Sequence, residues 1–129
     1  MAHHPIPLSP NPPVSNYLPL IGITMGDPTG IGPEIIGKAL SIEEPFQTCR
    51  PIVFGDRGVL SKTIEMLGLT TTVEVFETIP EKGYLPGKIF LLPLSQLEIP
   101  SLQFGKPDRA CGAAMVKYIE EAVNYTRRG

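Results

Sequence analysis

A cluster of glycines after a short apolar segment constrains the fold of this chain more than any other feature. Residues 20–23 are uncharged and mostly aliphatic, and Gly26, Gly30 and Gly32 follow them closely. Because glycine has no Cβ atom, the backbone can turn sharply there and a ligand can approach it closely. Pro33 suits the first turn of a helix, where its missing N–H costs no hydrogen bond. The pattern predicts a strand, a turn and then a helix whose free N–H groups face an anion or a nucleotide.

The spacing of these glycines differs from the two common nucleotide-binding motifs. It matches neither the Rossmann pattern nor a Walker loop, and no Lys-Ser or Lys-Thr pair follows it. A tight turn with a purely structural role is therefore an alternative to a ligand site. Asp27 and Glu34 flank the turn and have carboxylates for a cation, a ribose or a partner backbone. The simpler interpretation is favoured for both: Asp27 accepts hydrogen bonds from the turn itself, and Glu34 interacts with the helix dipole.

The composition is that of an ordinary globular protein. The chain has 129 residues, 42% of them hydrophobic, and a formal net charge of −2, which allows one modest domain. The lack of a basic cluster beyond Arg127-Arg128 argues against nucleic acid or an acidic membrane surface as a partner. No apolar stretch approaches the ~20 residues of a membrane span. Cys49 and Cys111 are expected to be reduced, which favours a cytoplasmic location.

The order of apolar patterns predicts alternating strands and helices after a Pro-rich leader, residues 1–17, that is expected to be flexible. Strands are predicted at residues 20–25, 51–55, 71–76 and 88–92, helices at 31–40, 57–67 and 109–127, and a loop at 95–105. Asp56 is the expected N-cap of the second helix. This order predicts a three-layer α/β/α fold with a parallel or mixed sheet.

Apolar spacing also predicts which face of each helix is buried. In the first helix the predicted buried residues are Ile31, Ile35, Ile36 and Ala39. In the second they are Val59, Leu60, Thr63, Ile64 and Leu67. In the long third helix they are Met115, Val116, Ile119, Ala122 and Val123.

The string over residues 23–34, Ile-Thr-Met-Gly-Asp-Pro-Thr-Gly-Ile-Gly-Pro-Glu, is more specific than its glycine spacing. It resembles the N-terminal signature of the 4-hydroxythreonine-4-phosphate dehydrogenase family. Further similar segments follow in the family's order at residues 52–56, 66–69, 104–107 and 113–122. The resemblance implies that residues 18–129 are the N-terminal portion of an α/β dehydrogenase. The implied fold is like that of isocitrate and isopropylmalate dehydrogenases, here incomplete.

The resemblance implies a metal- and NAD(P)-dependent enzyme that oxidises 4-phosphooxy-L-threonine to 2-amino-3-oxo-4-phosphooxybutanoate. This product loses carbon dioxide to give 3-amino-2-oxopropyl phosphate in pyridoxine biosynthesis. The implied cofactors are NAD or NADP and a divalent metal (Zn, Mg or Co), and the implied assembly is a homodimer. The alternative is a catabolic sibling that acts on 4-phospho-threonate or 4-phospho-erythronate, which are also small phosphorylated hydroxy acids.

The cofactor-binding residues that the resemblance implies are Gly26, Asp27, Gly30, Ile31 and Gly32. Ile31 is the expected apolar contact near the adenosine end of the cofactor. No catalytic residue or metal ligand is assigned, because the family's metal-binding histidines have no counterpart here. The only histidines are His3 and His4.

A second hypothesis, of a different class, is that the chain is a catalytically inert folding or interaction fragment. It rests on the missing histidines. An open reading frame that continues past Gly129 would favour the enzyme, whereas a stop codon there would favour the inert product. Parallel strands without further neighbours leave an open edge and an apolar face, so the isolated chain is expected to self-associate.

Overall fold

Parallel pairing of four strands builds the centre of the molecule. The computed structural model describes residues 18–98 and 109–128. Its elements are β1 (Leu20–Thr24), α1 (Gly32–Ala39), η1 (Glu44–Gln47), β2 (Arg50–Asp56), α2 (Arg57–Met66), β3 (Thr72–Val75), β4 (Lys88–Ser95) and α3 (Arg109–Arg128). The strand order is β1-β2-β4-β3, and every pairing is parallel. The predicted leader at residues 1–17 lies outside the described residues.

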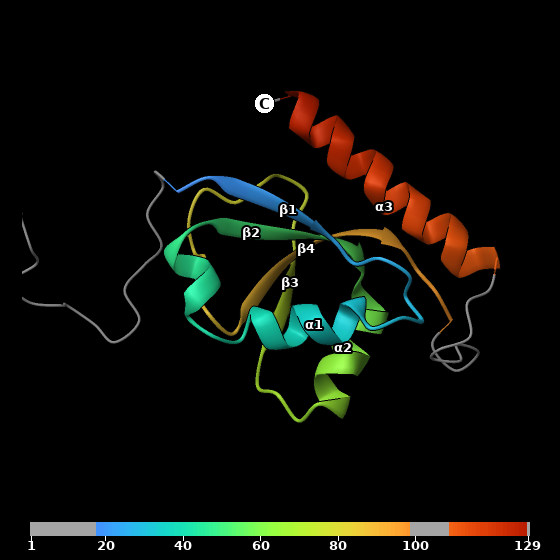
Figure 1. Ribbon diagram of the computed structural model, residues 1–129, viewed down its shortest axis with the longest axis horizontal. Helices are drawn as coiled ribbons and strands as arrows, with labels where there is room; N and C mark the ends of the chain where they lie inside the picture. Colours follow the sequence, from blue (N-terminus) through green and yellow to red (C-terminus); the bar gives the residue numbers. More distant parts are fainter. Residues whose placement is uncertain (1–17, 99–108, 129) are drawn as a thin grey trace, which may run out of the picture.

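The helices cover the sheet from both sides. Figure 1 shows α1 and α2 on one face of the sheet and α3 on the other. The two central strands, β2 and β4, are therefore the most buried, with Val53 and Leu91 fully enclosed. The three-layer α/β fold with a parallel sheet is confirmed.

The strand β4 is longer than the sequence predicts. It runs through Pro93 to Ser95, whereas the predicted strand ends at Leu92. A proline has no N–H to donate and is tolerated in a sheet at edges and bulges. Here the pairing with β2 shifts register between Gly55 and Asp56, opposite Pro93 and Ser95. The Phe76 N–H donates to the Leu91 carbonyl, so Leu91 and, by alternation, Pro93 face the β3 side, where the pairing with β3 has ended at Val75. The missing N–H of Pro93 therefore removes no hydrogen bond to β2.

The predicted buried face of α1 is wrong at two positions. Ile31 and Ile35 are 71% and 53% exposed, whereas Ile36 is buried as predicted, together with Pro33 and Gly37. Gly37 faces α2, where a Cβ would make ordinary contact at 3.6 Å with side-chain atoms of Ile64 and Leu67. The helix therefore turns Ile36 and Gly37 towards the core and Ile31 and Ile35 outwards.

The predicted apolar stripe of α3 is also wrong at three positions. Val116, Ile119 and Val123 are 50%, 48% and 46% exposed. The buried residues of the helix are Cys111, Ala114 and Tyr118, and Ala122 and Tyr125 pack partly against the core. This second stripe combines small side chains at Cys111, Ala114 and Ala122 with two tyrosines, Tyr118 and Tyr125, that pack against the core. The face of α2 is as predicted at Val59, Leu60, Thr63 and Ile64, with Leu67 half-buried.

Candidate cofactor site at the glycine turn

The glycine turn joins the carboxyl end of β1 to α1 and is closed by its own hydrogen bonds. Gly26 has a φ of 75°, which favours glycine. The Asp27 carboxylate accepts hydrogen bonds from the Thr29 backbone N–H (2.8 Å) and the Thr29 hydroxyl (2.6 Å). The Gly30 N–H donates to the Asp27 carbonyl oxygen at 2.9 Å. Asp27 therefore stabilises the turn, as the simpler interpretation of the sequence predicts.

Gly32 is needed for a different reason, namely the close approach of two backbone segments. A Cβ at this position would overlap the carbonyl oxygen of Met25, at the end of the strand that precedes the turn. A Cβ at Gly30 would lie 3.3 Å from the Asp27 carbonyl oxygen, which is tight but less severe. Neither glycine has a positive φ. The space at Gly32 is thus filled by the protein's own backbone.

The amino end of α1 is open. Ile31 occupies the N-cap position with φ −88° and ψ −9°, and no side chain caps the helix there. Glu34 lies in the first turn, and its carboxylate is 3.8 Å from the Lys38 ammonium group. The first N–H groups of a helix have no intrahelical acceptor, so this end offers donors to a ligand. The 71% exposed side chain of Ile31 adds apolar surface beside them.

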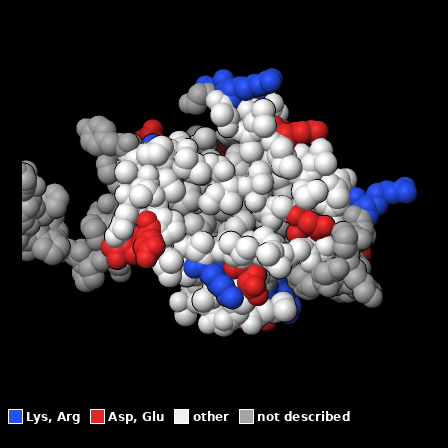
Figure 2. Space-filling view, in the orientation of Figure 1, with Lys and Arg blue, Asp and Glu red and all other residues white. Residues whose placement is uncertain are grey.

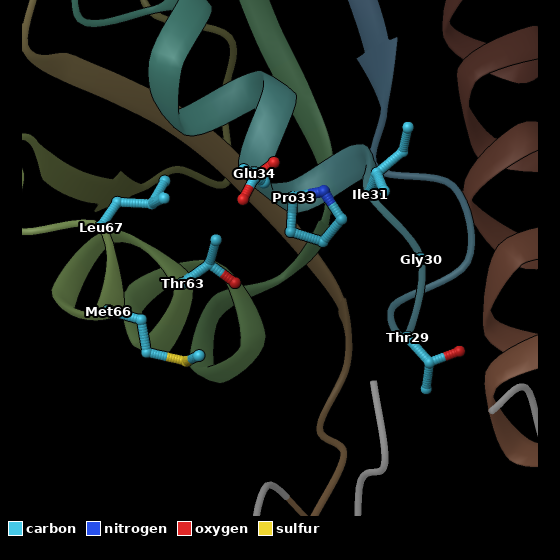
Figure 3. Close-up of a pocket in the computed structure, with 8 residues that line it drawn as sticks. All are labelled: Thr29, Gly30, Ile31, Pro33, Glu34, Thr63, Met66 and Leu67. Carbon is cyan, nitrogen blue, oxygen red and sulfur yellow. The ribbon is translucent and has the colours of Figure 1, made fainter. Parts of the chain in front are cut away.

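A groove of about 450 Å³ lies between the amino end of α1 and the second half of α2 (Figure 3). It is lined by Thr29, Gly30, Ile31, Pro33, Glu34, Thr63, Met66 and Leu67. In Figure 3 the side chain of Ile31 points away from Thr63 and Met66, so the isoleucine forms one rim of the groove. Glu34 is the only charged residue of the lining, which therefore suits an apolar group better than an anion.

The structure brings together only part of the set that the resemblance implies. Gly30 and Ile31 line the groove, whereas Gly26, Asp27 and Gly32 shape the turn behind it. The sequence analysis does not predict the contribution of α2, which supplies Thr63 and Met66, or of Leu67 directly after it. The sequence contains no signal for this contribution, because α2 reaches the turn through its packing on Gly37. Cofactor binding by the predicted residues stays a prediction.

The second strand-to-helix junction is a closed polar network. Asp56 is 1% exposed, and its Oδ1 accepts a hydrogen bond from the Val59 N–H at 3.0 Å, which confirms the predicted N-cap. Its Oδ2 accepts from the Ser95 hydroxyl and the Leu97 N–H, both at 2.8 Å. The Tyr118 hydroxyl lies 2.6 Å from the Ser95 hydroxyl. Since Ser95 donates to Asp56, Tyr118 must donate to Ser95.

The described residues do not fit a divalent metal. In residues 18–98 and 109–128, no three His, Cys, Asp or Glu side chains gather closely enough to hold a metal ion. The same ranges contain no helix long and apolar enough to span a membrane.

Several curated proteins are similar to this chain, although no family model matches it. The 4-hydroxythreonine-4-phosphate dehydrogenase of Desulforapulum autotrophicum is 40% identical over 111 residues, which are 86% of this chain and 33% of that protein. The protein of the same name from Desulfosudis oleivorans is 42% identical over 119 residues, 88% of this chain and 33% of its own length. A relative from Symbiobacterium thermophilum, named provisionally as a D-threonate 4-phosphate dehydrogenase, is 38% identical over 86% of this chain and 33% of its own length.

Solved structures agree with these relatives. The crystal structure of a 4-hydroxythreonine-4-phosphate dehydrogenase from Burkholderia phymatum has a TM-score of 0.81 and 35% identity, over 88% of this chain and 34% of that one. A structure of the same name from Klebsiella pneumoniae, at 24% identity and a TM-score of 0.78, covers 88% of this chain and 34% of its own and supports the fold.

The fold and these relatives first define a class: the chain is related to dehydrogenases built on a parallel α/β sheet. Within that class, the resemblance to the 4-hydroxythreonine-4-phosphate dehydrogenase family is confirmed over the stretch that they share. The chain spans about a third of the length of the curated relatives it matches.

Proposed function

We propose that this chain is part of a metal- and NAD(P)-dependent dehydrogenase that oxidises 4-phosphooxy-L-threonine to 2-amino-3-oxo-4-phosphooxybutanoate. Loss of carbon dioxide from this product gives 3-amino-2-oxopropyl phosphate for pyridoxine biosynthesis. The names of the relatives and the string over residues 23–34 support the proposal. The proposed assembly is a cytoplasmic homodimer, and no group of three candidate metal ligands gathers among the described residues.

The observation that carries the proposal is the exposed Ile31 beside an uncapped helix at the carboxyl end of a parallel strand. In open α/β sheets, ligands bind outside the carboxyl ends of the strands. Two features of the described residues support the adenosine end of a nicotinamide cofactor as the ligand. Ile31 gives apolar surface to a flat ring, and the first turn of α1 gives N–H donors. When bound, the cofactor supplies the hydride acceptor.

Glu34 and the two glycines next to Ile31 have supporting roles in this proposal. The carboxylate of Glu34 accepts hydrogen bonds from hydroxyl groups such as those of a ribose. Gly30 keeps the backbone beside Ile31 free of side chains, and Gly32 lets the helix start directly against Met25. The hydrogen bonds from Thr29 to the Asp27 carboxylate hold the turn in shape. In this proposal Asp27 positions Ile31 through the turn and does not itself contact the cofactor.

A substrate assay of the complete gene product tests the proposal. Purified protein is incubated with NAD or NADP, with a divalent metal, and with either 4-phosphooxy-L-threonine or D-threonate 4-phosphate. We expect reduced cofactor to form with the first substrate. Its formation should stop when a chelator removes the metal. Turnover of D-threonate 4-phosphate alone favours the catabolic activity suggested by the Symbiobacterium thermophilum relative. No turnover of either substrate contradicts both activities.

A further inference from the structure

A second hollow, of about 380 Å³, opens on the face of the sheet that α3 covers. Its floor is formed by alternate residues of β1 and of β2, which point to the same face of the sheet. Its walls come from the last two turns of α3 and from the segment between β3 and β4. The described lining residues, none of which lines the groove at the glycine turn, are Leu20, Gly22, Arg50, Ile52, Phe54, Ile79, Ala122, Tyr125 and Thr126.

Aromatic packing fixes the floor of this hollow. A Cβ at Gly22 would lie 2.9 Å from Phe54 Cε2, so the Phe54 ring occupies the space beside the glycine. The Tyr125 ring of α3 meets the Phe54 ring edge to face, with 5.5 Å between the ring centroids. Aromatic pairs prefer this geometry, which holds both rings in place. The apolar floor is therefore already formed in the absence of a ligand.

Arg50 is the charged residue of the described lining, and its side chain is held in position. It is the first residue of β2 and is half-buried. Its Nε–H donates to the Leu18 carbonyl at 2.7 Å, and the guanidinium lies 5.9 Å from the centroid of the Tyr84 ring. The hydrogen bond to Leu18 uses one of the five N–H donors of the guanidinium. None of the carboxylates in the described part of the chain forms an ion pair with it.

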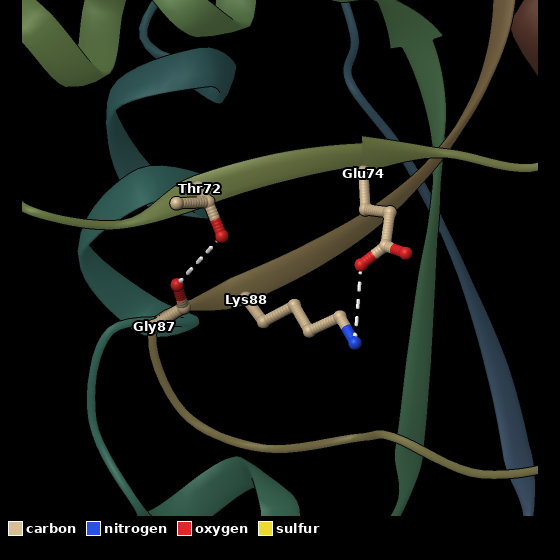
Figure 4. Close-up of polar contacts among 4 residues, drawn as sticks. All are labelled: Thr72, Glu74, Gly87 and Lys88. Atoms are coloured by element: carbon tan, nitrogen blue, oxygen red, sulfur yellow. Dashed lines mark hydrogen bonds and ion pairs between the residues drawn. The ribbon is translucent and has the colours of Figure 1, made fainter.

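Lys88, the first residue of β4, is a cation in a similar place that does have a counter-ion. Its ammonium group lies 4.8 Å from the centroid of the Phe90 ring and 3.0 Å from the Glu74 carboxylate (Figure 4). Both cations thus rest on an aromatic ring, but within the described residues only Lys88 is neutralised. Apolar neighbours reduce the screening of a charge by water, so the half-buried Arg50 attracts an anion.

The end of α3 adds positive charge beside the hollow. Arg128 lies 5.2 Å from the centroid of the Tyr125 ring, and Arg127 precedes it in the last turn of the helix. Figure 2 shows basic side chains where α3 ends and a mostly uncharged surface next to them. The rest of the lining is mainly apolar, so a matching ligand has an anionic head and an apolar body.

The single guanidinium of the lining favours a carboxylate over a phosphate as the anionic head. A carboxylate accepts two parallel hydrogen bonds from a guanidinium and carries one negative charge, which Arg50 balances. A phosphate monoester carries about −1.5 to −2 at pH 7, which one arginine does not balance. The aliphatic side chains of Leu20, Ile52 and Ile79 suit a flexible alkyl chain as the apolar body.

We propose that this hollow binds a medium-chain carboxylate, whose carboxyl group pairs with the Arg50 guanidinium and whose alkyl chain lies on Ile52 and Phe54. The site lies beside the first residues of β1, whereas the proposed cofactor site lies at the carboxyl end of that strand. The two sites can therefore be tested separately, and failure of one leaves the other unaffected.

Calorimetric titration of the complete gene product with octanoate tests the proposal. We expect saturable binding of octanoate. Octan-1-ol, which has the same alkyl chain without the charge, should bind at least about 10-fold more weakly. In methyl NMR spectra, octanoate should shift the signals of Ile52 and Ile79 and leave that of Ile31, at the glycine turn, unchanged.

Matched variants separate this site from general surface binding. Arg50→Gln should weaken octanoate binding at least about 10-fold, and Arg50→Lys, which keeps the charge, should weaken it less. Arg57→Gln, at an exposed arginine beside a different hollow, is the control. Ala122→Leu fills the hollow and should also weaken binding, whereas Ala113→Leu, at an exposed position of the same helix, should not.

Three results would overturn the proposal. One is the absence of octanoate binding by the complete gene product, because another segment of the protein then fills the hollow. Another is equal affinity for octanoate and octan-1-ol, or unchanged octanoate affinity in both Arg50→Gln and Ala122→Leu. The third is binding that leaves the Ile52 and Ile79 methyl signals in place.

Discussion

The two strand-to-helix junctions of this molecule each contain an aspartate, but only one of the two aspartates caps the helix that follows. At the end of β2, Asp56 is buried, caps α2 through the Val59 N–H and binds the end of β4. At the end of β1, Asp27 uses its carboxylate on Thr29 within the turn and leaves α1 without a side-chain cap. The first junction is complete without a ligand, whereas the second exposes helix N–H groups next to an isoleucine.

This difference separates a structural junction from one that can bind a ligand. A capped helix end with every carboxylate oxygen bonded has a structural role, however polar it is. An uncapped helix end beside exposed apolar surface leaves its donors to solvent or to a ligand.

Replacing Asp56 with alanine should have the largest effect on stability. The change leaves the Val59 and Leu97 N–H groups and the Ser95 hydroxyl without their acceptor inside the protein. The loss of a buried, charge-assisted network of this size should lower the free energy of unfolding by about 3–5 kcal/mol. Urea denaturation measures it. A loss below about 1 kcal/mol would contradict the structural role of this junction.

High pH should weaken the same junction through Tyr118. Burial raises the pKa of Tyr118 from 10.0 to about 12. Above pH 10 the unfolded chain releases this proton and the folded chain retains it, so stability falls as the pH rises towards 12. The full loss is about 2–3 kcal/mol. Denaturation curves from pH 8 to 11.5 measure the slope, which should be smaller in Tyr118→Phe; an equal slope in both proteins would contradict this account.

A Gly32→Ala substitution should destabilise the protein at the junction between β1 and α1. The new Cβ overlaps the Met25 carbonyl oxygen, so the turn or the helix must shift. We expect a loss of about 1–3 kcal/mol, as for other overpacked sites, visible as a lower melting temperature. Gly112→Ala is the control, since nothing lies within 4 Å of a Cβ there. Equal melting temperatures for the two variants would contradict the close backbone contact at Gly32.

The smallest of these effects is expected for Asp27→Ala. This carboxylate organises only Thr29, in a partly exposed turn, so its loss should lower stability by about 1 kcal/mol. Thermal denaturation beside Asp56→Ala measures the difference between the two aspartates. A loss as large as that of the Asp56 variant would remove the contrast between the junctions.

Local features of the fold could be predicted from the sequence because they depend on near neighbours. The order of strands and helices and the Asp56 cap are of this kind. The hydrogen bonds of Asp27 could also be predicted, since they lie within two residues of it.

The buried faces of two helices could not be predicted, because each helix offers two apolar stripes. In α3, hydrophobicity favours the stripe of Val116 and Ile119, but the sheet contacts the stripe that contains Ala114 and Tyr118. The choice depends on close packing and on the bond of Tyr118 to Ser95, which lies 23 residues away in the sequence. The α2 side of the groove was missed for the same reason, since only the tertiary packing of α1 on α2 creates it.

Cofactor affinity of an Ile31→Ala variant of the complete gene product tests the ligand-facing junction most directly. Because Ile31 is 71% exposed, its truncation should leave the melting temperature unchanged while NAD binding weakens by up to about 1–3 kcal/mol. The KM for the cofactor should rise with kcat nearly unchanged. Ile35→Ala, at another exposed isoleucine of the same helix, is the matched control and should bind NAD normally. Normal NAD binding by Ile31→Ala would contradict the account, and the glycine turn would then have a structural role alone.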